Sequence, residues 1–218
     1  MTEPETWWRD AVGPEWSGHT WAALAAALTP TLFGAGPAGL VTEARAWADE
    51  PANVLYVRSA SLRRAYGFAV SVAQRAARTM AAERGFSRHL LAVGVLDELS
   101  VPADPDPAAT AEAQANPRRQ QWTSADTRRR HLDDYAKPLE RADLTLLRLP
   151  PQGDAEQVLD QIADRRRNYL RPTILAGVVL PHEFAAAYGD GIASRFGFPR
   201  GDDAAPSKLT VLDLDQRP

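Results

Sequence analysis

The sequence contains no cysteine and only two lysines, Lys137 and Lys208, among its 218 residues. The lack of cysteine excludes disulfides, thiolate nucleophiles and thiolate metal sites. No apolar run approaches the length that crosses a membrane, and the acidic, polar first residues lack the charged-then-apolar pattern of a signal peptide. We therefore expect a cytoplasmic protein that makes no membrane contact.

Because lysine is scarce, the positive charge is almost entirely arginine, and much of it is clustered. Two triplets are candidates for DNA contact: Arg128, Arg129, Arg130, Arg165, Arg166 and Arg167. A guanidinium binds phosphate and carboxylate alike, and nearby acids such as Asp133 and Asp134 offer the alternative of a solvated helix face. The formal net charge of −3 does not by itself indicate a nucleic-acid binder.

The remaining polar residues predict neither a metal site nor a catalytic constellation. The four histidines are far apart in the sequence and show no spacing of four residues. No nucleophile elbow of the type G-x-S-x-G occurs. We therefore assign no catalytic and no metal-binding residues.

Two proline-bounded apolar runs, at 144–149 and 173–180, predict strands buried on both faces. The residues between them, 154–168, have helical spacing, so the three pieces form one parallel crossover unit. Further strands are expected at 53–58, 89–96 and 208–212. The predicted fold is α/β, a three-layer parallel sheet flanked by helices. It comprises a Trp-rich arm at 1–28 and a domain at 29–218 with a flexible insertion at about 101–121.

Four segments in the last third of the chain carry a family resemblance: ADLTLLRL at 142–149, DRRRNY at 164–169, RPTIL at 171–175 and GDGIASRF at 189–196. Their order resembles the C-terminal half of the AAA+ ATPase domain in DnaC/IstB-like proteins, the helicase loaders and transposition helpers. The resemblance implies a P-loop NTPase fold in which 144–149 is the Walker B strand and 173–180 the sensor strand. It also implies that Arg195 lies at a subunit boundary near a nucleotide.

A short strand at 31–33 followed by glycines stands where a phosphate loop is expected, and Gly34-x4-Gly39 has its spacing. The candidate nucleotide-binding residues, which are degenerate, are Gly34, Gly36, Gly39, Leu40, Val41 and Thr42. Leu40 replaces the lysine that reaches the phosphates, Val41 replaces the hydroxyl that ligates magnesium, and Thr42 comes one place late. The alternative is an ordinary glycine turn between a strand and a helix.

The two other positions that ATP hydrolysis requires, Walker B and the sensor, are also substituted. Arg148, Leu149 and Pro150 stand where the resemblance places the Walker B acids. The sensor strand reads Ala176-Gly177-Val178, with no Asn or Thr side chain that could orient a water molecule. A rival acidic site is Asp97 with Glu98, which follow the run at 89–96. Substitution of the lysine, the hydroxyl, the Walker B acid and the sensor together predicts a domain that keeps the fold but does not hydrolyse ATP.

Contacts with a partner are expected from Trp7, Trp8 and Trp16, because tryptophan is frequent at interface hot spots. For Arg195, the resemblance implies a contact with a partner or a neighbouring subunit. Packing of the tryptophans on the parent domain is the alternative. For Arg195, the alternative is a role at the C-terminal end of its helix.

The sequence thus predicts a catalytically inactive AAA+-like binding or assembly protein, without a cofactor, acting in DNA replication, transposition or a mobile element. Its expected partner is a protein, with an active AAA+ ATPase or helicase, DNA and oligomerisation as candidates. Two alternatives stay open: an active non-standard ATPase of the helicase-loader type that uses ATP and Mg²⁺, and a sequence-independent DNA-binding protein.

Overall fold

Five short strands form the centre of the computed structural model, which describes residues 4–27, 36–85, 87, 89–96, 124–151, 156–168, 171–199 and 209–215. They are β1 (Val54–Arg58), β2 (Leu91–Val95), β3 (Leu144–Arg148), β4 (Thr173–Gly177) and β5 (Leu209–Asp213). The strands pair in the order β2-β3-β4-β1-β5, and every pairing is parallel. The prediction of a parallel α/β sheet is confirmed.

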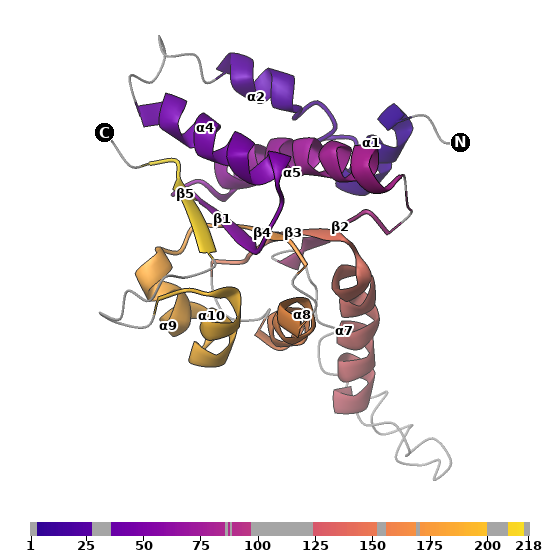
Figure 1. The fold of residues 1–218 in the computed structure, drawn as a ribbon. Helices are drawn as coiled ribbons and strands as arrows, with labels where there is room; N and C mark the ends of the chain where they lie inside the picture. The colour runs from indigo at the N-terminus through magenta and orange to yellow at the C-terminus, as the bar shows by residue number, and fades with distance from the viewer. Residues whose placement is uncertain are drawn as a thin grey trace.

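Helices cover both faces of this sheet (Figure 1). On one face lie α1 (Pro4–Val12), α2 (Trp21–Ala27), α4 (Gly36–Asp49) and α5 (Leu62–Arg84). On the other lie α7 (Ser124–Arg141), α8 (Glu156–Asn168), α9 (Phe184–Tyr188) and α10 (Asp190–Phe196), with the 3-10 turn η2 (Pro181–Glu183) before α9. A parallel sheet needs such cover because both of its faces are apolar. Within the described ranges, no helix combines the length and apolarity needed to span a bilayer.

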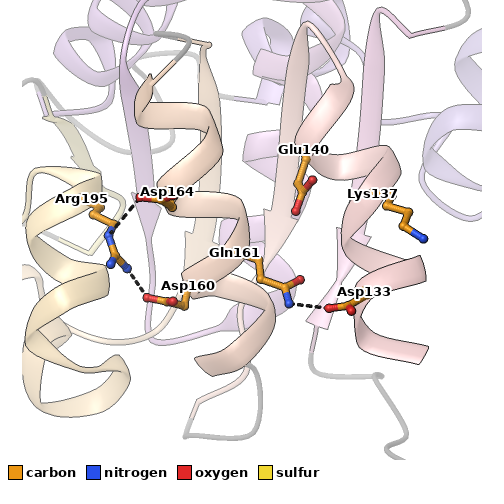
Figure 2. A pocket seen from close by; sticks show the side chains of 7 residues that line it. All are labelled: Asp133, Lys137, Glu140, Asp160, Gln161, Asp164 and Arg195. Carbon is orange, nitrogen blue, oxygen red and sulfur yellow. Dashed lines mark hydrogen bonds and ion pairs between the residues drawn. The ribbon is translucent and has the colours of Figure 1, made fainter. Parts of the chain in front are cut away.

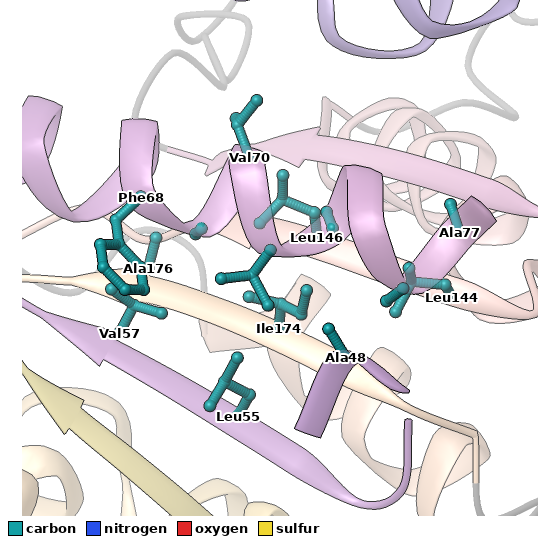
Figure 3. Packing of buried hydrophobic residues seen from close by; sticks show 14 of the residues in the cluster. Ala48, Leu55, Val57, Phe68, Val70, Ala77, Leu144, Leu146, Ile174 and Ala176 are labelled. Carbon is teal, nitrogen blue, oxygen red and sulfur yellow. The ribbon is translucent and has the colours of Figure 1, made fainter. Parts of the chain in front are cut away.

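Each strand contributes to two cores because alternate side chains point to opposite faces. In β3, Leu144 and Leu146 join the core under α5, whereas Leu147 joins the core over α7 and α8. Figure 3 shows the first of these cores, in which side chains of β1, β3 and β4 lie against α5. The buried face of α5 is rich in alanine, so this helix can lie close to the sheet: Ala65, Ala69, Ala73, Ala76 and Ala77.

The Trp-rich N-terminal segment contributes to the core under α5. The side chains of Trp8 and Trp16 are only 4% and 8% exposed, and the Trp16 ring lies 4.8 Å from the Tyr66 ring, edge to face. Two of the three tryptophans expected to contact a partner are therefore buried in their own domain, and only Trp7 is half-buried. Burial of apolar area explains this outcome, since the arm can cover Trp8 and Trp16 without a second protein.

Several predicted features lie outside the described residues. They are the strand at 31–33, Gly34, Asp97, Glu98 and the insertion at about 101–121.

Candidate functional site

The sheet has one topological switch point, where two neighbouring strands lead to opposite faces. From β1 the chain enters α5 on one face, and from the adjacent β4 it enters η2 and α9 on the other (Figure 1). In open α/β sheets, ligands bind at such a point, outside the carboxyl ends of the strands. The candidate site is therefore the end of β1 and the turn that follows it.

The register shows which residues meet there. Arg58, the last residue of β1, lies opposite Gly177 of β4 on one side and Asp213 of β5 on the other. The amide of Ser59 donates to the carbonyl of Gly177 at 3.2 Å, and the amide of Leu214 donates to the carbonyl of Arg58 at 2.9 Å. Hydrogen bonds thus join the carboxyl ends of β4, β1 and β5.

The centre of the site is the carboxylate of Asp215, just beyond β5. It accepts hydrogen bonds from the Ser59 hydroxyl at 3.0 Å, from the Ala60 amide at 2.5 Å, and from the guanidinium groups of Arg58 at 3.3 Å and Arg64 at 3.1 Å. The nearby Asp213 carboxylate also pairs with Arg58, at 3.2 Å. Four donors from the turn at residues 58–64 therefore converge on one anion.

The electrostatics favour the ionised form of Asp215. Partial burial raises the pKa of this carboxyl, but the hydrogen bonds from Ala60 and Ser59 and the charges of Arg58 and Arg64 outweigh it, so the pKa lies below its usual value. The side chain of Asp215 stays 25% exposed and that of Arg64 46% exposed, so the cluster opens to the surface. We describe these residues, Arg58, Ser59, Ala60, Arg64 and Asp215, as the β1-edge cluster.

The sequence by itself did not connect the members of this cluster. Its members lie about 150 residues apart in the chain, and only the pairing of β5 with β1 brings them together. A usable signal was present, since the turn after β1 has two serines, Ser59 and Ser61, and the latter caps α5 through the amide of Arg64. A strand that leads directly into a capped helix predicts a donor-rich turn.

The predicted phosphate loop has a different setting. Gly36 begins α4, so Gly39, Leu40, Val41 and Thr42 lie within that helix rather than in an open loop. Leu40 packs against the core under α5, and α4 precedes β1 in the chain. At the switch point, the strand that leads into α5 is β1, which follows α4. The expected loop position after residues 31–33 is thus not the turn that the sheet places at its switch point.

The positions that the resemblance assigns to Walker B and the sensor lie at the same carboxyl end of the sheet as the β1-edge cluster. Arg148 ends β3 opposite Ala176 of β4, and its guanidinium carbon lies 5.3 Å from the centre of the Tyr66 ring in α5. This is a cation–π contact. The backbone of Gly177 is approached by the side chain of Tyr56, whose hydroxyl donates to the carbonyl of Val179 at 2.6 Å. Arg148 of β3 and Tyr56 of β1 thus lie on either side of β4.

Arg195, near the C-terminal end of α10, forms ion pairs with two acids of α8. Its guanidinium contacts the carboxylate of Asp160 and lies 3.8 Å from that of Asp164. Figure 2 shows these pairs at one end of a cavity of about 480 Å³ that α7, α8 and α10 line, with Lys137 and Glu140 at the other end. A role for Arg195 toward a partner stays a prediction, and within the chain this arginine joins α10 to α8.

Arg166 differs from the expected DNA contact because it points into the protein. Its side chain is 2% exposed and donates to the carbonyls of Leu139, at 3.1 Å, and Ala142, at 2.9 Å, as well as to the hydroxyl of Thr173 and the carbonyl of Pro172. Burial, with a smaller effect of Arg171, lowers its pKa to about 9, so it remains charged at neutral pH. The hydrogen-bonding needs of the C-terminal end of α7 explain this placement.

The other five arginines of the two triplets remain predictions. Their backbones lie in α7 and α8, and their side chains fall outside the described part of the structure: Arg128, Arg129, Arg130, Arg165 and Arg167. Among the described residues, no group of three or more histidines, aspartates and glutamates is arranged to hold a metal ion.

Comparison with protein-family models and with curated proteins finds no match to this chain. The interpretation of the β1-edge cluster therefore rests on its geometry.

Proposed function

We propose that this chain is a non-hydrolysing binding or assembly protein with an AAA+-like architecture. In this proposal the sheet provides a rigid scaffold, and the position of a bound nucleotide is closed by the chain itself. The partner is expected to be a protein of DNA replication or transposition, as the resemblance in the last third of the chain implies.

The observation that carries the proposal is the state of the switch point. The turn at residues 58–64 reads RSASLRR, without a lysine and without a glycine. Its amide, hydroxyl and guanidinium donors already bind the carboxylate of Asp215. A phosphate needs the same donors, so nucleotide binding would have to break these contacts.

The rest of the edge supports the same interpretation. Arg148 places a positive charge at the end of β3, where hydrolysis requires a carboxylate to hold Mg²⁺. Gly177 at the end of β4 has no side chain that could orient a water molecule. The all-parallel sheet, with helices on both faces, is compatible with the P-loop-type fold that the resemblance implies.

The test is titration of the purified protein with ATP and Mg²⁺ in a calorimeter, with an active AAA+ ATPase in the same buffer as a positive control. We expect no binding below millimolar ATP and no release of phosphate. Micromolar binding would contradict the proposal and favour a non-standard ATPase instead.

A further inference from the structure

The contacts of Asp215 are more numerous than an edge strand needs for its attachment. Strand β5 is already joined to β1 by the parallel ladder from Leu209 to Asp213, and Asp213 pairs with Arg58. Asp215 lies beyond this ladder and binds a second arginine, a hydroxyl and an amide. Its carboxylate therefore has the surroundings of a bound ligand.

We infer that Asp215 is an internal ligand whose carboxylate closes an anion site formed by residues 58–64. When the turn that carries Asp215 is released, the same donors bind a phosphate-type anion from solution. This inference deepens the proposed function and rests on it, since it identifies what keeps the site closed.

The donor set determines the class of ligand. Two guanidinium groups, one hydroxyl and one backbone amide suit an oxyanion with several oxygens, and guanidinium groups bind phosphate through paired hydrogen bonds. The side chain of Arg64 is 46% exposed, so a second phosphate group can extend from the site toward the solvent. The predicted ligand is an oligophosphate or a molecule that carries one.

Tethering explains why the closed form dominates. A carboxylate attached two residues beyond β5 has a high effective concentration at the turn, of the order of millimolar or more. A free anion must compete with it at every encounter, so the intact protein is expected to bind anions only weakly.

The experiment measures binding of pyrophosphate to the full chain by calorimetry, without nucleotide. Asp215→Ala should bind pyrophosphate at least tenfold more tightly than the unsubstituted protein. The matched control is Asp49→Ala, which also removes a carboxylate paired with an arginine of α5, Arg75, but away from the β1-edge cluster. This control should leave binding unchanged.

A second pair of variants locates the binding site. In the Asp215→Ala background, Arg64→Ala should abolish the gain, whereas Arg63→Ala should keep it, because Arg63 is exposed and has no contact with Asp215 in the described structure. If both arginine substitutions abolish the gain equally, pyrophosphate responds to overall positive charge rather than to the β1-edge cluster, and the inference is overturned.

Asp215→Asn guards against a failure to fold, because it keeps the shape of the side chain and removes its charge. If either variant folds but gains no pyrophosphate binding, the inference is overturned. It is also overturned if both variants unfold, because Asp215 would then be needed for the stability of the fold. In either case the absence of ATP binding by the unsubstituted protein would still support the proposed function. Micromolar ATP binding by the unsubstituted protein would overturn both.

Discussion

At the scale of single residues, the most informative side chain is Arg166, a buried cation without a carboxylate partner at hydrogen-bond distance among the described residues. Its guanidinium donates to main-chain carbonyls at the end of α7 and to the hydroxyl of Thr173 in β4. Arg171 contacts the neighbouring carbonyls of Glu140 and Arg141. The two arginines satisfy carbonyls that a helix end leaves unpaired and complement its dipole.

Substitution of Arg166 by leucine should lower the free energy of unfolding by about 3 kcal/mol, because it leaves several buried carbonyls without donors. Arg166→Lys keeps the charge but cannot reach all of the acceptors, so its loss should be smaller. Arg78→Leu, at an exposed position on α5, is the control and should change stability by less than about 0.5 kcal/mol. Urea unfolding measures all three, and equal stability of Arg166→Leu and Arg78→Leu would contradict the assigned role.

At the scale of elements, β1 and β4 approach each other closely through Tyr56 and Gly177. A methyl group at Gly177 would lie 2.9 Å from the Tyr56 hydroxyl oxygen, and Tyr56 is fully buried with its hydroxyl on Val179. Here the strand pairing depends on a residue without a side chain.

Gly177→Ala should therefore destabilise the protein by about 1–3 kcal/mol through overpacking. Tyr56→Phe alone should cost about 1 kcal/mol, since it loses the hydrogen bond to Val179. The double variant should lose less than the sum of the two, because removal of the hydroxyl relieves the clash.

Gly39→Ala provides the comparison for this pair. Gly39 lies in α4 with no atom near an added methyl group, so alanine there should be neutral or stabilising by up to about 1 kcal/mol. Thermal unfolding measures the stability of the four variants. If the stability losses of Gly177→Ala and Tyr56→Phe are strictly additive in the double variant, there is no direct clash between the two side chains.

At the scale of the whole molecule, the N-terminal segment belongs to the folded body of the protein. Trp8, Val12 and Trp16 share a core with α5 and with strands β1, β3 and β4. The segment predicted as an arm thus packs on the side of the sheet that carries α4 and α5, away from α7 and α8 (Figure 1).

Trp8→Ala should accordingly lower the free energy of unfolding by about 3–5 kcal/mol, the usual cost of truncating a buried tryptophan. Trp7→Ala is the matched control, since Trp7 is the neighbouring residue but only half-buried, and it should cost clearly less. Denaturant unfolding followed by far-UV circular dichroism gives both values. Equal, small losses would mean that Trp8 serves a partner rather than the core.

The local pattern of the sequence determined the parallel sheet. Proline-bounded runs of Leu, Val, Ile and Thr indicate buried strands because each residue's environment follows from its near neighbours. The position of Arg148 at the end of the apolar run at 144–149 is likewise visible in the sequence itself.

Only the tertiary structure decided which turn lies at the switch point and what occupies it. The order of strands places β5 beside β1 and so brings Asp215 to Ser59 and Arg64, and no local pattern encodes that neighbour. The same holds for Arg166, which resembles its neighbours Arg165 and Arg167 in the sequence but is buried in the fold. Contacts between distant residues depend on how strands and helices are arranged, and that arrangement follows from the burial of all the apolar surfaces together.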